Sequence, residues 1–363
     1  MSFSLERMFV DVFAPQAGDV VTIMYDVPHG EIHDTQEWRD RRQMAEEWHQ
    51  EIARFSRKYG LSLGPVVMYE ATGAHNGELP EYGLCQEDRV RLADIAGLSS
   101  IIISMPQFSA SAPLIVFTKK YENLRVASLP TVTKAMQESG LSADYRGVAA
   151  TCAQLAPLFD QSDGIEVMFS TGDICYFDLS DDKPAIQDDG RLHPGADRSA
   201  FRFRNLPSGE VCVVPNESPD SRTTGRIPVS YGGEAALFVV QNNQVIDVCG
   251  DGPLAAKKRQ EFRDEKALRN VAEVAIGCND KAVVTGNVLE DEKAGFHWAY
   301  GRSDHIGGAV GPKDFTAPDR ALHQDIVYAK GNPIVCRRLD FIFPDGTRKT
   351  VIRDGVLNIH DDA

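Results

Sequence analysis

Residues 19–28, "DVVTIMYDVP", are followed by "DTQEWRDRRQMAEEWHQEIARFSRKYG" at 34–60 and by "GPVVMYEA" at 64–71. The first and third pieces are short apolar runs bounded by turn residues, which is typical of buried strands. In the middle piece apolar residues recur at helical spacing, Asp34 or Thr35 can cap its start, and Gly60 can end it. A strand, a helix and a second strand in this order predict a parallel sheet covered by helices.

The alternation continues through the first part of the chain. A helix is expected over 85–97, and apolar runs of strand length occupy 99–106 and 124–130. We therefore predict a Rossmann-like α/β domain with a parallel sheet over residues 1–165. No G-x-G-x-x-G follows the first strand, so the domain lacks the dinucleotide fingerprint, and no nicotinamide or flavin cofactor is expected.

Residues 166–363 have a different pattern. Short strand candidates are separated by Gly, Asn, Asp and Pro turns, and one helix is expected over 255–277. This pattern predicts an α+β, strand-rich second domain, with the boundary between residues 160 and 170.

The composition limits the classes of partner. A formal net charge of −15 argues against nucleic-acid binding, because an acidic surface repels phosphates. No apolar run reaches the roughly 20 residues that span a bilayer, and the N-terminus lacks a secretion pattern. We therefore expect a cytoplasmic protein with no membrane contact. The seven cysteines include no C-x-x-C pair, which argues against a thiolate zinc site.

Side chains of the kinds that bind metals gather in four short pieces of the expected second domain. Glu210 follows a P-S-G turn, Glu273 interrupts the apolar run "VAEVAI", and "HQDI" places His323 and Asp325 on one face of an expected strand. The remaining piece, "LEDEKAGFHWAYGRSDHIGG" at 289–308, contains Glu290, Glu292, His297, Asp304 and His305.

Taken one at a time, these residues have simpler explanations. His323 with Asp325 is equally consistent with an exposed ion pair, and acidic residues also occur in structural networks. Glu273 is the exception, because a carboxylate drawn into an apolar interior must be paired, protonated or bound to a cation. A mixed set of Glu, Asp and His suits Zn²⁺, Co²⁺ or Mn²⁺. Such a set exceeds what one tetrahedral ion needs, which suggests two ions that share a carboxylate and activate a water molecule.

The four pieces, in this order, resemble the conserved blocks of the M29 family of metallo-aminopeptidases, the aminopeptidase T or thermophilic aminopeptidase family. "RNLPSGEV" is similar to N-[ML]-P-[ST]-x-E-V, "AEVA" to G-E-[VL]-A, "DEKAGFHWAYG" to D-E-N/K-x-x-x-H-x-A-x-G, and "HQDI" to H-x-D-[FI]. The resemblance is clearest over residues 200–330. It implies the metal ligands Glu210, Glu273, His297, His323 and Asp325, two divalent ions, and a homodimer with the active site in an internal chamber.

The resemblance also implies amide hydrolysis of a small-molecule or short-peptide substrate, with Glu273 or Glu292 as the general base. One position departs from the family pattern. Seven residues after the family histidine, the aminopeptidases have a tyrosine near the metals, where this chain has Asp304. An ionised carboxylate cannot donate a hydrogen bond to a developing oxyanion. We therefore expect the neighbouring His305 to take that role.

Two alternatives remain. The same superfamily contains 2,5-dihydroxypyridine dioxygenase, a mononuclear iron enzyme that cleaves a heteroaromatic ring. It keeps the H-x-D pair, lacks the first glutamate and has a histidine at the second, so two His and one carboxylate hold its Fe(II). Because this chain retains Glu210 and Glu273, we expect the hydrolase rather than the dioxygenase. The other alternative is a catalytically silent binding protein that keeps the fold.

Overall fold

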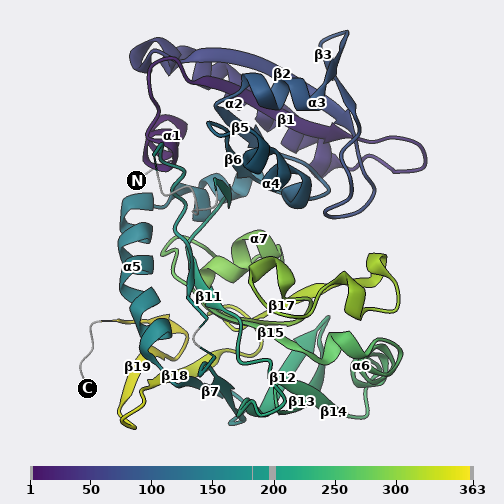
Figure 1. Ribbon diagram of the computed structural model, residues 1–363, viewed down its shortest axis with the longest axis vertical. Coiled ribbons are helices and arrows are strands. Elements are labelled where there is room, and N and C mark those ends of the chain that lie inside the picture. The colour runs from purple at the N-terminus through teal and green to yellow at the C-terminus, as the bar shows by residue number, and fades with distance from the viewer. Residues whose placement is uncertain (1–2, 182, 196–201, 360–363) are drawn as a thin grey trace. The chain divides into compact units, whose positions relative to one another are not determined.

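The computed structural model describes residues 3–181, 183–195 and 202–359 (Figure 1). The chain forms two compact units. The first contains Met1–Ala149, Asp188–Ser208 and Asp280–Ala282, and the second contains Ala150–Gln187, Gly209–Asn279 and Val283–Ala363. The predicted order, an α/β domain followed by a strand-rich domain, is confirmed. The predicted boundary at residue 165 falls inside the second unit, and residues 188–208, expected in the second domain, lie in the first unit.

The first unit contains a seven-stranded sheet in the order β10-β6-β5-β1-β2-β3-β4. The first five strands in this order run parallel, and β3 and β4 form an antiparallel hairpin beside β2. The strands are β1 (Val20–Val27), β2 (Ser62–Glu70), β3 (Tyr82–Cys85), β4 (Asp88–Arg91), β5 (Ile101–Ser104), β6 (Arg125–Ser128) and β10 (Phe203–Asn205). Each apolar run that was predicted to be a strand in this unit therefore forms one.

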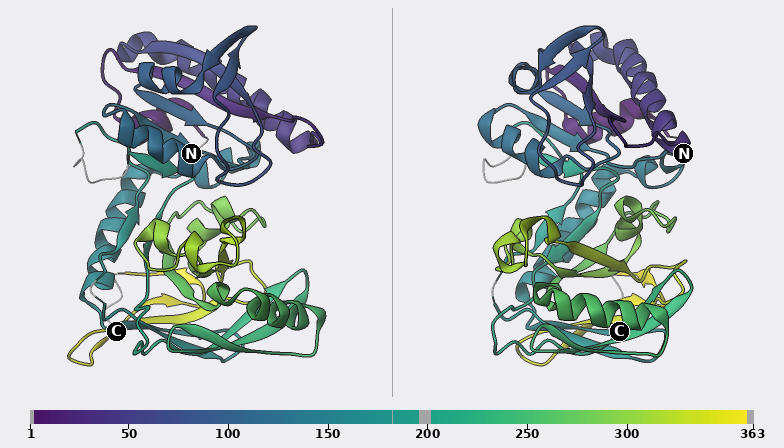
Figure 2. Two further views of the ribbon diagram at one scale, coloured as in Figure 1. Left: turned by 45° about the vertical axis from the view of Figure 1, so that its right-hand side comes forward. Right: turned by 90° about the vertical axis from the view of Figure 1, so that its right-hand side faces the viewer.

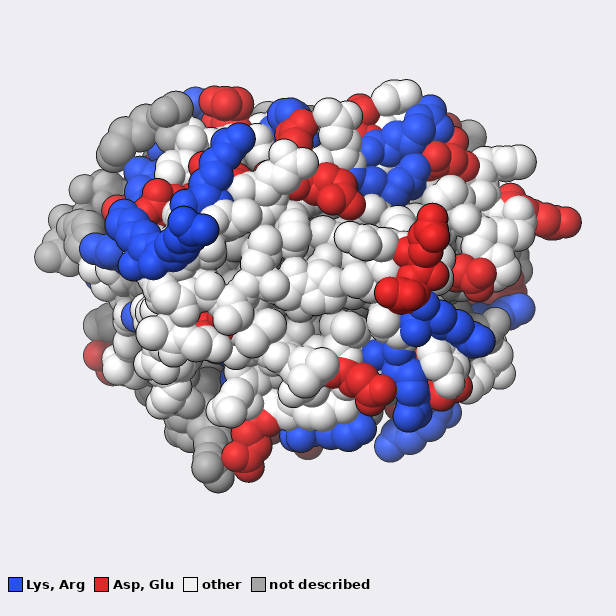
Figure 3. Space-filling model, turned by 90° about the horizontal axis from the view of Figure 1, so that it is seen from above, with Lys and Arg blue, Asp and Glu red and all other residues white. Residues whose placement is uncertain are grey.

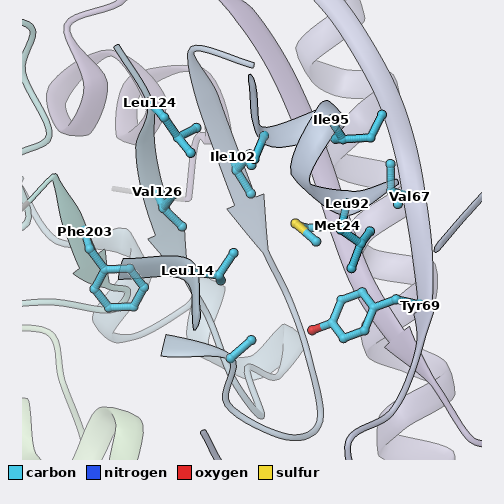
Figure 4. Packing of buried hydrophobic residues seen from close by; sticks show 12 residues of the cluster. Met24, Val67, Tyr69, Leu92, Ile95, Ile102, Leu114, Leu124, Val126 and Phe203 are labelled. Atoms are coloured by element: carbon cyan, nitrogen blue, oxygen red, sulfur yellow. The ribbon is translucent and has the colours of Figure 1, made fainter. Parts of the chain in front are cut away.

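Helices cover both faces of this sheet. They are α1 (Leu5–Phe13), α2 (Gln36–Tyr59), α3 (Leu92–Leu98) and α4 (Ser111–Lys120), and α5 (Tyr145–Gln161) contains the point where the chain leaves the unit. On one face, α3 and α4 pack on the strands through a buried cluster that includes Leu92, Leu114 and Val126 (Figure 4). The predicted caps of α2 are confirmed: the Thr35 side chain accepts a hydrogen bond from the Trp38 N–H, and Gly60 ends the helix with φ 67°.

The helix predicted over 85–97 is wrong in its first half. Tyr82–Cys85 and Asp88–Arg91 pair as the β3–β4 hairpin, and only Leu92–Leu98 is helical. The reason is local: Gln86 has φ 56°, a left-handed conformation that turns the chain back on itself and cannot continue a helix. Apolar spacing alone does not reveal such a turn.

The second unit contains two sheets. The five-stranded sheet has the order β17-β16-β15-β11-β9, and the eight-stranded sheet has the order β14-β13-β12-β8-β7-β18-β19-β20. The five strands of the smaller sheet are β9 (Ile186–Asp188), β11 (Glu210–Val213), β15 (Val271–Gly277), β16 (Phe296–Gly301) and β17 (His323–Val327). The strands of the larger sheet are β7 (Gly164–Phe169), β8 (Ile174–Asp178), β12 (Thr224–Tyr231), β13 (Glu234–Gln241), β14 (Gln244–Cys249), β18 (Cys336–Ile342), β19 (Arg348–Arg353) and β20 (Val356–Leu357).

The helix predicted over 255–277 corresponds to two elements. Helix α6 (Pro253–Asp264) lies beside β13 and β14 (Figure 2), and Val271–Gly277 forms the central strand β15. Every residue of β15 is buried, because the strand lies between β11 and β16 and is covered on both faces. A strand buried on both faces lacks the alternation that identifies a half-exposed strand, so "VAEVAIG" can be mistaken for helix. Helix α7 (Val288–Asp291) follows it.

Aromatic residues hold the two sheets of the second unit together. Strand β16 reads Phe296-His297-Trp298-Ala299-Tyr300-Gly301, and its large rings contact rings of the eight-stranded sheet and of α6. Phe238 of β13 lies edge-on to Trp298, with 6.3 Å between the ring centroids. Because side chains alternate along a strand, the opposite face of β16 carries only His297, Ala299 and Gly301. One face of the smaller sheet is thus a packed core, and the other is polar and lined by small residues.

Charged side chains of both signs share the surface seen in Figure 3, where Lys and Arg lie among Asp and Glu. Among the residues that the structure describes, no helix is long and apolar enough to cross a membrane.

Candidate metal centre

The register of the five-stranded sheet gathers the five predicted ligands on one face. Residues directly opposite each other in antiparallel strands have side chains on the same side of the sheet. Ala299 of β16 is opposite Glu273 on β15 and opposite Asp325 on β17, so the two carboxylates flank one alanine. Likewise His323 is opposite Gly301, His297 is opposite Ala275, and Glu210 is opposite Gly277. Each ligand candidate thus has an alanine or glycine beside it, so no large side chain of the neighbouring strand separates the candidates from one another.

Glu273, His323 and Asp325 form the tightest group. One potential ligand atom from each lies within 4.8 Å of the other two. His323 Nε2 is 2.9 Å from Glu273 Oε2 and 3.4 Å from Asp325 Oδ1. His323 Nδ1 donates a hydrogen bond to the Arg302 carbonyl oxygen at 2.6 Å. A backbone carbonyl on the second ring nitrogen is the usual support of a metal-binding histidine, because it fixes the ring and its tautomer.

A second group lies beside this triad. His297 Nε2 is 3.3 Å from Glu210 Oε2 and 3.9 Å from Glu273 Oε1, and its Nδ1 faces the Gly295 carbonyl at 3.2 Å. Lys293 Nζ is 2.6 Å from Glu210 Oε1 and 2.7 Å from Glu292 Oε1. The Lys293 side chain is only 1% exposed. The Lys293 ammonium is therefore enclosed between the carboxyl groups of Glu210 and Glu292.

The charges in the site shift one another's pKa values strongly. Burial alone would raise the pKa of Glu210, but the Lys293 ammonium and His297 lower it to about 2. Burial would disfavour the charged His297 ring, yet Glu210, Glu273 and Asp325 raise its pKa to about 9. Burial raises the pKa of Glu292 to about 8 against the effect of Lys293, with Glu210 and Asp325 adding to the rise. Such opposed shifts within one cluster are typical of functional sites.

The residues present fit a divalent ion. Carboxylate oxygens and an imidazole nitrogen are good donors for Fe²⁺, Mn²⁺, Co²⁺ or Zn²⁺, and the triad offers all three from two strands of one sheet. In addition, Glu210 Oε2 is buried, and its neighbour is the titratable His297 Nε2 at 3.3 Å. A buried carboxylate oxygen beside a group that can release its proton indicates a site built for positive charge.

The other predicted residues are less central. His305 lies against His323, with 4.7 Å between the ring centroids and the rings perpendicular. Desolvation of the ring and the neighbouring His323 lower the pKa of His305 to about 4, although the residue as a whole is exposed. Asp304 is exposed and pairs with Arg302, its Oδ1 2.5 Å from the arginine Nε. Glu290 is buried in α7. Of the residues predicted around the family tyrosine position, His305 therefore lies next to the triad, and Asp304 does not.

Three residues near the site were not predicted. Lys293 directly follows Glu292 in the "DEKAGFH" block, and this adjacency was the available signal. Cys212 lies on the same face as Glu210, and burial, with Glu273 and Glu210 nearby, raises the pKa of its thiol. Glu217 accepts hydrogen bonds from Ser303 Oγ at 2.5 Å and from the Ala309 N–H at 2.7 Å, so it holds the loop that carries His305. No sequence pattern links Glu217 to that loop.

Comparison with known proteins supports the fold. The structure is similar to that of 2,5-dihydroxypyridine dioxygenase from Pseudomonas putida KT2440, with a TM-score of 0.63. The match covers 98% of this chain and 96% of that chain, at 13% sequence identity. No protein-family model and no curated protein matches the sequence. The matched enzyme is the superfamily member that the sequence offered as the alternative, while the M29 assignment and a homodimer stay predictions.

Proposed function

We propose that this protein is a metal-dependent enzyme in which Glu273, His323 and Asp325 hold a divalent ion, and that it cleaves a hydroxylated aromatic or heteroaromatic ring with dioxygen. The observation that carries the proposal is the triad itself: three donor atoms within 4.8 Å of one another. They lie in a fold that matches a ring-cleaving dioxygenase over 98% of the chain. The likeness in fold supports this reaction class over the hydrolase that the sequence favoured.

The donor set explains how such a site works. A bound Fe²⁺ would supply open coordination positions for dioxygen and for the substrate hydroxyl groups. The protein fixes the ligands: the Arg302 carbonyl orients His323, and strand pairing across Ala299 places Glu273 and Asp325 on either side. His305 lies against His323 and can exchange a hydrogen bond with a substrate hydroxyl.

The set differs in one ligand from the two-histidine arrangement described above for the dioxygenase. Glu273 stands where that enzyme is expected to have a histidine, so one imidazole and two carboxylates face the ion. The two carboxylates neutralise a divalent ion, whereas one carboxylate leaves it with a net positive charge. We therefore propose that this chain binds the ion through a more anionic donor set than the dioxygenase does.

Amide hydrolysis is the second candidate, and a specific observation favours it. Glu210 and His297, the additional ligands that the M29 resemblance implies, lie beside the triad, and Glu292, its candidate general base, lies next to Lys293. In that reaction a bound ion would supply a water molecule of lowered pKa, and Glu273 or Glu292 would accept the proton of that water. His305 then serves as the hydrogen-bond donor to the oxyanion.

Loading the metal-free protein separately with Fe²⁺, Mn²⁺, Co²⁺ and Zn²⁺ tests the proposal. We expect dioxygen uptake and loss of ring absorbance with dihydroxypyridines or dihydroxybenzenes, in the presence of Fe²⁺ only. His323→Ala should abolish this activity. His49→Ala is the matched control, because His49 contacts the Gly64 carbonyl in the first unit. Hydrolysis of aminoacyl p-nitroanilides with Zn²⁺ or Co²⁺, without dioxygen uptake, would establish the second candidate instead. A folded protein that binds none of the four ions would refute both.

A further inference from the structure

We propose that the Lys293 ammonium takes the place of a second metal ion, so that the centre holds one ion per chain. This inference rests on the proposed metal-dependent function and adds the number of ions to it. It opposes the two-ion centre that the M29 resemblance implies, because that centre would need a second cation among Glu210, Glu292 and His297.

The position of the ammonium is the first argument. Lys293 Nζ lies 2.6 Å from Glu210 Oε1 and 2.7 Å from Glu292 Oε1, so it contacts two of the three groups available to a second ion. A metal ion needs contacts of about 2.0–2.6 Å to the same oxygens, so the ion and the ammonium compete for one location. Only 1% of the Lys293 side chain is exposed, so in this conformation the ammonium has no route to solvent.

The second argument is the anchoring of the lysine backbone. The Lys293 carbonyl accepts a hydrogen bond from the Asn279 N–H at 3.0 Å, and the Gly277 N–H donates to the Gly295 carbonyl at 2.8 Å. The segment packs so closely on the end of β15 that a Cβ at Gly277 would lie 2.2 Å from the Glu292 carbonyl oxygen. The backbone around Lys293 is therefore held by the end of β15, a strand of the sheet that carries the site. Lys293 is thus a fixed part of the centre and not a surface side chain that has turned inwards.

Charge balance is the third argument. Four carboxyl groups surround the site, those of Glu210, Glu273, Glu292 and Asp325. One divalent ion balances Glu273 and Asp325, and Lys293 lies between the other two. A second divalent ion would sit against a fixed positive charge in a buried environment, where repulsion between like charges is poorly screened. The ammonium thus supplies the positive charge that a second ion would supply, and it cannot be removed by chelators.

Counting bound ions in matched variants tests the inference. The metal-free protein is titrated with Mn²⁺, and bound ions per chain are counted by equilibrium dialysis with elemental analysis. We expect one ion in the wild type and two in Lys293→Ala, which removes the ammonium and opens its space. The two Mn²⁺ ions of the variant should give the spin-coupled electron paramagnetic resonance spectrum of a neighbouring pair, which the wild type lacks.

Two further variants serve as controls. Lys258→Ala should keep one ion, because Lys258 pairs with Glu261 at 2.7 Å and with the Tyr300 hydroxyl at 2.9 Å, outside the ligand group. Lys293→Arg keeps the positive charge and should also bind one ion. Mn²⁺ should raise the melting temperature of Lys293→Ala more than that of the wild type, because the ion restores the lost positive charge.

The outcomes separate the two proposals. Two ions in the wild type, or one in a folded Lys293→Ala, would overturn the inference and leave the metal-dependent function standing. No bound ion in the wild type would refute the proposed function, and the inference with it. If Lys293→Ala does not fold, the wild-type count decides: one ion supports the inference, and two ions refute it.

Discussion

Two buried carboxylates, Asp26 in the first unit and Glu273 in the second, are held in opposite ways. Asp26 lies one residue before the end of β1 and accepts hydrogen bonds from the Gln107 N–H, the Phe108 N–H and Trp38 Nε1 at 2.7–3.0 Å. Titratable side chains surround Glu273: His323 at 2.9 Å, His297 at 3.9 Å and the Cys212 thiol. One carboxylate is satisfied by fixed donors, and the other by groups that can release a proton.

This difference separates a structural acid from a candidate metal ligand. Backbone and indole N–H groups cannot give up their protons, so Asp26 has no reason to bind a cation. Imidazolium protons can be replaced by an ion, which is how ligand deprotonation couples metal binding to proton release. Burial by itself therefore does not identify a metal ligand, whereas the nature of the partners does.

The largest expected effect is on stability, at Asp26. Asp26→Ala leaves the partly buried Gln107 and Phe108 N–H groups without this acceptor, while Trp38 Nε1 keeps its second acceptor, the residue 26 carbonyl oxygen at 3.1 Å. It should lower the free energy of unfolding by roughly 3–5 kcal/mol. Urea denaturation followed by circular dichroism measures it. Metal-free Glu273→Gln is the counterpart and should change stability by less than about 1 kcal/mol, because it removes one of several crowded negative charges. Equal losses in the two variants would erase the distinction.

Metal binding should respond in the reverse sense. Glu273→Gln removes a negatively charged donor and should weaken binding of Fe²⁺ or Mn²⁺ by more than about 100-fold, since loss of even an outer partner costs about 10–100-fold. Asp26→Asn should bind the ion as the wild type does. Isothermal titration calorimetry on both variants decides the point, and unchanged affinity in Glu273→Gln would remove this residue from the ligand set.

A smaller effect is expected at Glu217. Its carboxylate ties Ser303, Ala309 and Asn270 together, so Glu217→Ala should loosen the loop that carries His305. We expect kcat/KM to fall about 10-fold while the number and affinity of bound ions stay constant, because His305 is not among the proposed ligands. Glu217→Gln, which keeps an oxygen acceptor, should recover part of the activity. A parallel loss of metal would show that Glu217 acts on the centre itself.

The smallest effect concerns a second structural acid, Asp178. Burial would raise its pKa, but the Arg222 guanidinium and the N–H groups of Arg222 and Ser180 lower it. A lowered folded-state pKa stabilises the protein above the unfolded value of about 3.9, and this contribution is lost as pH falls through the folded value. Because Arg222 is half exposed, we expect only about 1 kcal/mol. Denaturant midpoints at pH 6 and pH 3 should differ less in Asp178→Asn than in the wild type.

Local patterns predicted elements whose signals are local. Thr35 and Gly60 mark the ends of α2, and the run "VVTIMYDV" forms β1. The errors arose where the deciding contact was distant or conformational. The positive φ at Gln86 creates a hairpin, and the neighbours β11 and β16 make Val271–Gly277 a strand. The strand β10 joins the first unit's sheet by pairing with β6, far away in sequence.

The site predictions divide in the same way, between features with local signals and features set by distant contacts. The i, i+2 spacing of His323 and Asp325 correctly predicted that they share a face. That Glu210, Glu273 and His297 lie on that same face depends on the register of four strands, which spacing within one segment does not reveal. The position of Lys293 between Glu210 and Glu292 was also hidden, because Glu210 lies 83 residues from Lys293 in the sequence. Sequence therefore indicated the ligand types, and the three-dimensional register supplied their arrangement.

Among the described strands, β17 is an edge of its sheet and pairs with β16 alone, yet it carries His323 and Asp325. Glu273 lies on β15, on the far side of β16. An ion bound by Glu273, His323 and Asp325 would cross-link β17 to β15 across the intervening strand β16. Loss of the ion would then do more than abolish the activity. It would release an edge strand whose unpaired backbone groups are open to other chains, so chelation and aggregation of this protein should be linked.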